Sequence, residues 1–213
     1  MTTLIRSIAL LALTILTAGQ ALAQNNVFKT GVVYYDTHSE TTGIQGIGVP
    51  PGADAETSDA TTVLFTYERM LRPDLGIELV LGIPPKFETK ATGSVAFLGD
   101  NILSAKNVSP TLLLNYHFGA PSDTWRPYVG AGINYTHFTN IESSLAPQVE
   151  MSDSWGWAVQ AGVDYALNKQ WGLWGSIAAL KVKSDVVAVG ATVLTTTIDF
   201  RPVTYAFGVF YKF

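Results

Sequence analysis

Large hydrophobic side chains alternate with small or polar ones in eight segments of the chain, each about ten residues long. The clearest segment is 153–165, where Trp155, Trp157 and Val159 alternate with glycine, alanine and polar residues. A period of two is typical of a β-strand, because successive side chains point to opposite faces. The predicted strands are 27–36, 61–70, 75–83, 108–118, 126–138, 153–165, 171–181 and 203–213.

The connections between these strands alternate in length. Short turns at 71–74, 119–125 and 166–170 are separated by long polar connections at 37–60, 84–107, 139–152 and 182–199. This alternation predicts that the two ends of the strand region lie on one side and the long loops on the other. It is typical of outer-membrane barrels, which have short periplasmic turns and longer external loops.

The two faces of the strands differ in character. One face carries aromatic residues near the strand ends, and the other is rich in Gly, Ala, Ser and Thr. A lipocalin-like soluble barrel also has eight strands, but it would turn its apolar face inward and a charged face to water. An aromatic face pointing outward favours a lipid-facing barrel instead. The aromatic set includes Trp155, Trp157, Tyr165, Trp171, Tyr205, Tyr211 and Phe213.

Composition narrows the class of protein further. Only 14% of the residues are charged and 47% are hydrophobic, which leaves little charge for a water-facing surface. The absence of cysteine excludes disulfides and thiolate metal sites. The net charge of -4 argues against a nucleic-acid partner, which would require a basic surface.

The first 23 residues have the pattern of a secretory signal peptide. Arg6 precedes an apolar run at 8–16, and the small-x-small sequence ALA ends at Ala23. A membrane anchor is the alternative, but the apolar run is shorter than the roughly 20 residues that a spanning helix needs. We therefore expect a signal peptide at 1–23 and a single barrel domain at 24–213.

Several strand segments resemble the OmpW family of outer-membrane proteins, which includes the AlkL-type hydrocarbon-uptake porins. The resemblance rests on the segments RPYVGAGINYTHF, DSWGWAVQAGVDY, SPTLLLNYHFG and GIELVLGIP and on the aromatic terminus ending in YKF. It fails in the loops at 38–60, 91–106 and 183–198. It implies an eight-stranded barrel in the outer membrane of a Gram-negative bacterium, with a narrow apolar channel for small hydrophobic molecules.

The inward-facing residues change in character along the barrel axis. Toward the external end they are apolar or small, and we expect them to bind the solute: Val33, Leu64, Val80, Leu113, Ala158, Ala178, Leu180 and Ala206. Toward the periplasmic end they are polar and of both charges, and we expect a plug: Lys29, Glu68, Glu78, Asn115, His117, Gln160, Asp164 and Lys212. Eight strands leave room for little more than side chains or one small ligand.

Such a plug would prevent straight passage, so the predicted exit is lateral, into the membrane. Proline weakens a strand ladder, and Pro110 and the pair Pro84 and Pro85 are the candidates for the gap. The alternative is a barrel with a filled interior that acts as a structural anchor or as a receptor. Its external loops would then bind a phage, a bacteriocin or a host surface.

Catalysis and metal binding are not predicted. The three histidines are isolated: His38 lies in a loop beside Ser39 and Glu40, His117 points into the lumen, and His137 has no serine two residues on. The loop acids Asp54, Glu56 and Asp59 lack the spacing of a calcium loop. The expected partners are small hydrophobic solutes, outer-membrane lipid and the barrel-assembly machinery, which would engage the closing strand that ends at Phe213; no cofactor and no nucleic acid is expected.

Overall fold

The computed structural model describes residues 25–190 and 192–213, so the predicted signal peptide lies outside the described residues. Eight antiparallel strands form a closed barrel in the order β12-β13-β16-β1-β5-β6-β9-β10, and β10 pairs back with β12. This confirms the predicted fold. The barrel strands are β1 (Asn26–Asp36), β5 (Ala60–Arg72), β6 (Leu75–Gly82), β9 (Thr111–His117), β10 (Trp125–Ser143), β12 (Ser154–Ala166), β13 (Trp171–Leu180) and β16 (Val203–Lys212).

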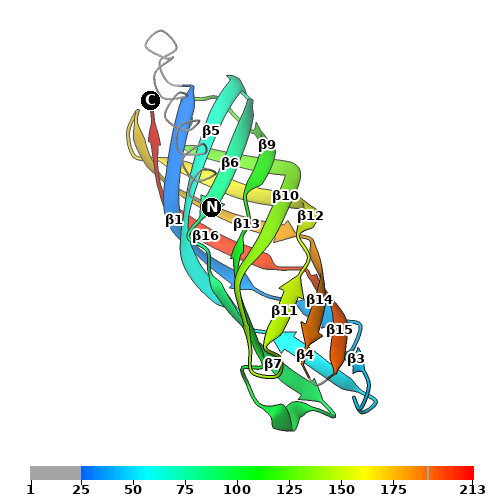
Figure 1. Cartoon of the computed structure of the whole chain (residues 1–213). Coiled ribbons are helices and arrows are strands. Elements are labelled where there is room, and N and C mark those ends of the chain that lie inside the picture. Colours follow the sequence, from blue (N-terminus) through cyan, green and yellow to red (C-terminus); the bar gives the residue numbers. More distant parts are fainter. Residues whose placement is uncertain (1–24, 191) are drawn as a thin grey trace, which may run out of the picture.

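The molecule is an elongated cylinder with two different ends (Figure 1). At one end, here called the terminal end, β1 begins beside the C-terminus, and Phe213 exchanges backbone hydrogen bonds with Asn26. The long connections lie at the opposite end, here called the hairpin end. Among the described residues, no helix is both long and apolar enough to cross a bilayer.

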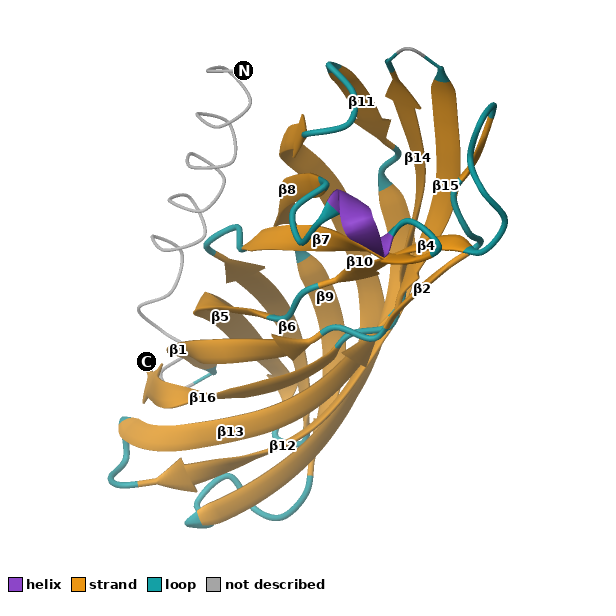
Figure 2. Ribbon diagram, turned by 90° about the horizontal axis from the view of Figure 1, so that it is seen from below, coloured by secondary structure: helices purple, strands orange, loops and turns teal. Residues whose placement is uncertain are grey.

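The four long connections are not irregular loops, as their polar sequences suggested, but contain additional short strands. These strands lengthen the barrel wall into a second tier (Figure 2). Most of them pair within two groups, β4-β7-β8-β10 and β11-β14-β15-β2. They are β2 (Ser39–Thr41), β3 (Gln45–Gly46), β4 (Ala53–Thr57), β7 (Lys86–Gly93), β8 (Leu103–Val108), β11 (Gln148–Met151), β14 (Val182–Val189) and β15 (Val193–Phe200), with a 3-10 turn η1 at Ala96–Leu98.

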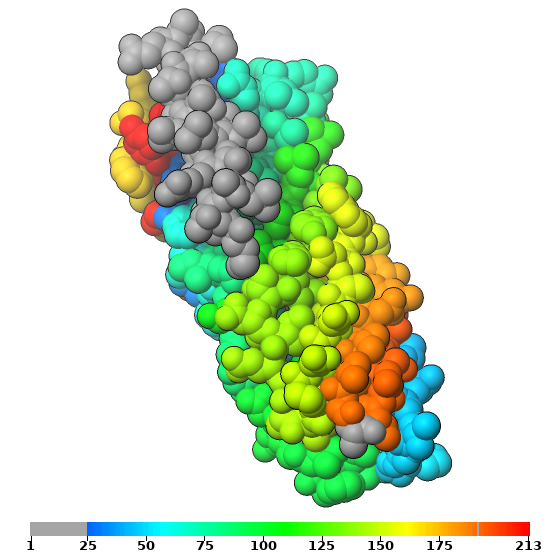
Figure 3. All heavy atoms as spheres, viewed as in Figure 1, coloured from blue at the N-terminus to red at the C-terminus, as the bar shows by residue number. Residues whose placement is uncertain are grey.

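Most predicted strand ends agree with the structure to within two residues, but two differ by more. Val108 belongs to β8 of the second tier and not to the barrel strand. The strand conformation is interrupted at Ser109 and Pro110, before β9 begins. β10 continues five residues beyond the predicted end at Phe138, since its last part pairs with β8. On the face seen in Figure 3, the side chains of this second tier form a surface continuous with that of the barrel.

The outward positions of the strands are apolar and exposed, as the alternation predicted. Trp155 is 73% exposed and Phe207 is 69% exposed. Aromatic pairs occupy both rims: Trp171 and Tyr211 have ring centroids 4.8 Å apart at the terminal end, and Tyr135 and Trp155 have the same spacing toward the hairpin end. An apolar band between two aromatic girdles is the surface that a lipid bilayer covers.

Candidate functional site

A network of buried charges crosses the barrel near its terminal end. The ammonium group of Lys29 lies 3.0 Å from Asp164 Oδ1 and 3.4 Å from Glu68 Oε2. Nε2 of His117 lies 2.7 Å from the other oxygen of Glu68. Lys29 also lies over the ring of Tyr128, with 4.4 Å from its nitrogen to the ring centroid. Because these groups are buried, each charge is compensated by direct contacts rather than by water.

Glu78 extends the network toward the middle of the barrel. Its carboxylate accepts hydrogen bonds from Thr66 Oγ1 at 2.6 Å, Asn115 Nδ2 at 2.8 Å and Gln160 Nε2 at 2.7 Å. The same Asn115 amide donates to Glu68 at 3.0 Å, which joins the two parts. Glu78 is therefore stabilised mainly by neutral donors and Glu68 mainly by a cation.

The structure brings most of the predicted plug residues together. Lys29, Glu68, Glu78, Asn115, His117, Gln160 and Asp164 all take part in the network. Lys212 does not; its nitrogen lies 5.0 Å from the ring centroid of Phe210. Apart from Gln160, the plug residues in the network are at most 3% exposed.

Large inward side chains at this level were missed by the sequence reasoning. Tyr128, Trp174 and Phe210 are at least 95% buried, and Arg126 donates to the carbonyl of Pro73. Inward glycines on neighbouring strands provide their space: a Cβ on Gly162 would collide with Tyr128, and one on Gly172 with Phe210. The glycines indicate large inward side chains on the neighbouring strands only once the strand register is known.

An apolar cavity lies above the network, toward the hairpin end. The volume that the centre of a water-sized sphere can occupy in this cavity is about 110 Å³. A site for a single water needs roughly 10–15 Å³ by the same measure. Six of the predicted solute-binding residues line it: Leu64, Val80, Leu113, Ala158, Ala178 and Leu180. Val33 and Ala206 instead belong to a packed core cluster with Trp174 and Phe210. That the six residues bind a solute stays a prediction.

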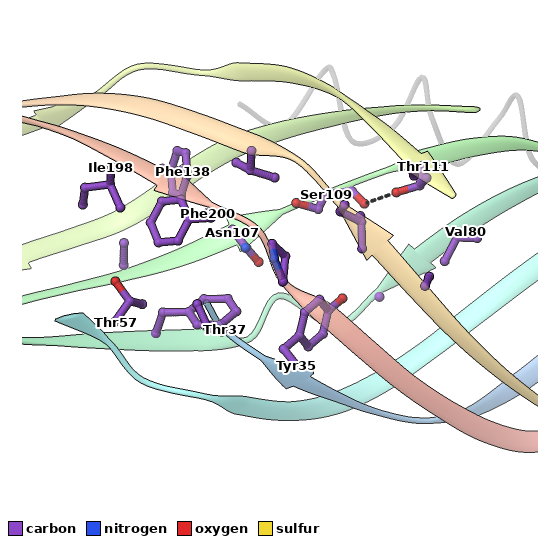
Figure 4. A pocket seen from close by; sticks show the side chains of 18 of the residues that line it. Tyr35, Thr37, Thr57, Val80, Asn107, Ser109, Thr111, Phe138, Ile198 and Phe200 are labelled. Atoms are coloured by element: carbon purple, nitrogen blue, oxygen red, sulfur yellow. Dashed lines mark hydrogen bonds between the residues drawn. The ribbon is translucent and has the colours of Figure 1, made fainter. Parts of the chain in front are cut away.

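The cavity also has walls that the barrel strands do not supply. Phe87 and Thr89 come from β7, Leu103 and Ala105 from β8, and Ile198 and Phe200 from β15. Figure 4 shows Phe138, Phe200 and Ile198 together at one side of the cavity. None of the lining residues is Asp, Glu, Lys, Arg or His. The cavity can therefore hold an uncharged molecule, whereas an ion would lack a counter-charge in the wall.

A second cavity of about 60 Å³ lies farther toward the hairpin end. Its lining is almost wholly apolar and includes Ile44, Ile102, Val149, Val186 and Leu194. It shares three lining residues with the first cavity: Thr89, Leu103 and Ile198. The second tier thus encloses an apolar space that adjoins the first cavity.

The barrel wall is interrupted beside the first cavity. The β6–β9 ladder ends at the pair Val80 and Thr111, and pairing resumes at Lys86 and Lys106 between β7 and β8. Between these two points, the two segments of the chain share one backbone hydrogen bond, from Asn107 N–H to the carbonyl oxygen of Pro85 at 3.4 Å. The interruption coincides with Pro84, Pro85 and Pro110, which cannot donate to a ladder.

The cavity reaches this interruption. Leu81, Gly82, Asn107 and Ser109 flank the break and line the cavity. Leu81 occupies an outward position of β6 and is 42% exposed, so it contacts both the cavity and the outer surface. This is the part of the wall where the interior and the lipid-facing surface come closest.

Nδ1 of His38 lies 3.7 Å from Asp36 Oδ1, and the other two histidines have carboxylate partners that the sequence did not reveal. His117 pairs with Glu68 in the network, and Nδ1 of His137 lies 2.7 Å from Asp153 at the outer rim. Tyr135 also donates to Asp153, and the hydrogen bonds from Tyr135 and His137 lower the pKa of Asp153. No described serine or threonine hydroxyl is hydrogen-bonded to either ring, so neither pair has the nucleophile of a hydrolase.

The loop acids are engaged in structural contacts. Asp54 accepts from Thr41, Glu56 lies 3.1 Å from Lys90, and Asp59 accepts from Tyr34 at 2.6 Å. Within 25–190 and 192–213, no group of three or more potential His, Cys, Asp or Glu metal ligands occurs.

Comparison with known proteins gives a uniform result. A sequence model described as the OmpW family matches residues 24–213. Outer membrane protein W of Escherichia coli K12 is 33% identical over 177 residues, which cover 78% of each chain. Outer membrane protein AlkL of Ectopseudomonas oleovorans is 26% identical over 79% of this chain and 73% of its own. The crystal structure of the outer membrane protein OprG of Pseudomonas aeruginosa superposes with a TM-score of 0.82 and 25% identity, over 90% of this chain and 96% of that one.

Proposed function

Because this chain belongs to the OmpW family and is an outer-membrane β-barrel, we propose that it takes up small hydrophobic molecules. The solute enters the apolar interior from the hairpin end, which faces outside, and leaves laterally into the outer membrane. The observation that carries the proposal is the uncharged cavity directly above a closed polar network. The similarity to AlkL, together with the hydrocarbon uptake that the family resemblance implies, supports the same class of solute.

The driving force for entry is the hydrophobic effect. Each methylene group that moves from water into the cavity contributes about 0.8 kcal/mol. The adjoining cavity in the second tier supports an entry route, because its apolar wall continues into the first cavity through Leu103 and Ile198. A molecule entering from outside would thus remain in contact with apolar side chains.

The polar network opposes direct passage to the periplasm. A hydrophobic molecule would have to separate Lys29 from Asp164 and Glu68, and the buried charges would then lose their partners. Breaking a buried ion pair costs about 3–5 kcal/mol, and a hydrocarbon offers no replacement contacts. The lateral route avoids this barrier, since the interruption between β6 and β9 lies beside the cavity and above the network.

We further propose that the protein is not an enzyme, since its family relatives are outer-membrane barrels and its His–carboxylate pairs have no bonded nucleophile. The open cavity also weighs against the alternative of a purely structural anchor or receptor, for which a filled interior was expected. A receptor role of the external loops would not require the cavity at all.

Cross-linking the interrupted wall tests the proposal. Ile83 and Val108 are outward-facing residues on either side of the break, and the chain has no native cysteine. In the double variant Ile83→Cys and Val108→Cys, a short bismaleimide should slow the uptake of labelled octane by intact cells. The matched control is Leu112→Cys with Ile133→Cys, which are paired and exposed on the intact β9–β10 seam.

The outcomes separate the two parts of the proposal. Uptake that falls only in the Ile83 and Val108 variant supports both. Uptake that is unchanged by this cross-link would overturn the lateral route. Uptake no faster than in cells carrying an empty plasmid would overturn transport itself.

A further inference from the structure

The middle of the first cavity contains hydrogen-bonding groups that the protein does not use. The hydroxyl oxygen of Thr37 is buried and has no partner among the described residues. Asn107 is half-buried and lines the same cavity, and its side-chain amide makes no hydrogen bond within the described residues. Buried polar groups are paired in nearly all native proteins, so the unpaired Thr37 hydroxyl and the free Asn107 amide at a cavity need an explanation.

Most other polar groups of the cavity wall are already bonded within the protein. Gln160 donates to Glu78 and to Asn115, Ser109 shares a hydrogen bond with Thr136, and Thr111 accepts from Asn134. Free capacity is therefore concentrated at Thr37, at Asn107 and at the hydroxyl of Tyr35, which also lines the cavity and has no hydrogen-bond partner among the described residues. It does not extend over the cavity floor.

These groups lie between two apolar parts of the cavity. Figure 4 shows Asn107 between the aromatic pair Phe138 and Phe200 on one side and Val80 on the other. The strand register agrees, because Asn107 is the partner of Phe138 in the β8–β10 ladder. A molecule that filled the cavity would place its apolar parts against the aromatic and aliphatic walls and its middle or one end against the free polar groups.

The chemistry of the two groups defines what they can recognise. A threonine hydroxyl and an asparagine amide can each donate and accept a hydrogen bond, and both are neutral. The cavity lining contains no charged side chain. A carboxylate would enter without a cation, which strongly disfavours its burial. A pure hydrocarbon would remove water from Asn107 and would leave the Thr37 hydroxyl unpaired.

We infer that the cavity prefers a solute with an apolar body and one neutral hydrogen-bonding group, such as an alcohol, a phenol or a ketone, over the matching hydrocarbon or carboxylate. Thr37 and Asn107, together with the hydroxyl of Tyr35, are the specificity-determining groups. The inference rests on the proposed function, and it identifies the class of hydrophobic molecule that the same cavity selects.

Uptake of three matched probes tests the inference. The initial rates of uptake of radiolabelled octane, octanol and octanoate are measured in intact cells that express the full chain. The wild-type protein should take up octanol faster than octane, and octanoate most slowly. In Asn107→Leu and in Thr37→Val, which preserve approximate side-chain size, the octanol-to-octane ratio should fall roughly two- to tenfold, the effect of losing one net hydrogen bond.

Thr139→Val is the matched control, because Thr139 lies on the outer surface of β10 and is not part of the cavity lining. Heat-modifiable migration on gels confirms that each variant folds. Retained uptake with an unchanged octanol-to-octane ratio in both cavity variants would overturn the inference and leave the proposed function intact. A lack of uptake of octane and octanol by the wild-type protein would overturn the proposed function, and the inference with it.

Discussion

Lys29 is the residue on which the closed section of the barrel depends most. Its side chain has no solvent exposure and is the shared partner of Asp164 and Glu68. Asp164 is itself almost fully buried, so neither carboxylate has water as an alternative partner. Burying these three groups together is tolerable because each lies within contact distance of an opposite charge.

Removing this cation should therefore be costly. Lys29→Met leaves two buried carboxylates without their cation and should lower the free energy of unfolding by about 3–5 kcal/mol, the range for breaking a buried ion pair. Urea unfolding in phospholipid vesicles measures the change. Lys212→Met is the control, since Lys212 makes no ion pair within 25–190 and 192–213 and should cost much less. Equal losses in the two variants would show that the network does not stabilise the barrel.

Single residues also show where sequence reasoning reached its limit. The alternation of inward and outward side chains along each strand predicted that Lys29, Glu68, Glu78 and Asp164 lie inside the barrel, and the structure brings them together. This alternation did not show which of them would be partners, because an ion pair such as that of Lys29 with Asp164 joins residues 135 positions apart in the sequence. The cavity-lining residues from β7, β8 and β15 were missed for a related reason: their segments were expected to be loops.

At the scale of elements, the barrel strands were predictable and the second-tier strands were not. A lipid-facing strand must be apolar on its outer face over its whole length, which produces a strong period of two. The second-tier strands are exposed on one side and contain many polar residues, Thr above all. In β7, for example, Phe87, Thr89 and Ala91 face inward and Lys86, Glu88 and Lys90 outward. This alternation is present, but mixed polar sequence of this kind is also typical of loops.

The polarity of β12 yields a direct test of the two strand faces. Val159 lies in the middle of the outward face and is 44% exposed, whereas Gln160 points into the barrel and contacts Glu78. Val159→Arg should make folding into vesicles less favourable by about 2–4 kcal/mol, as a cation does at the bilayer midplane. Gln160→Arg should cost less, because the new cation lies near the carboxylate of Glu78. The reverse order would mean that the faces are inverted.

At the scale of the whole molecule, the interior is divided along the barrel axis. Toward the terminal end the interior contains buried charged and amide side chains, and toward the hairpin end it contains two adjoining apolar cavities. A water-filled pore has no need of the apolar part, and a straight hydrophobic pore could not contain the charged part. The interrupted β6–β9 ladder lies beside the apolar part and above the network, as the proposed lateral route requires.

This division predicts that uptake depends on the apolar cavity and not on the charge below it. Ala178→Trp narrows the cavity and should slow the uptake of long alkyl solutes severalfold, at a cost in stability of about 1–3 kcal/mol, typical of overpacking. Ala179→Trp places the same side chain on the outer face, beside Val159, and should leave uptake unchanged. Uptake by intact cells, normalised to the amount of heat-modifiable protein, measures both effects.

Glu78→Gln completes the comparison. Thr66, Asn115 and Gln160, the groups that donate to Glu78, are neutral, so removing its charge leaves no cation unpaired and should preserve the barrel. On the lateral route the solute never crosses this level, and uptake should stay near the wild-type rate. If uptake instead fell in Glu78→Gln and was indifferent to Ala178→Trp, the solute would have to pass through the terminal end, and the network would be its gate rather than its floor.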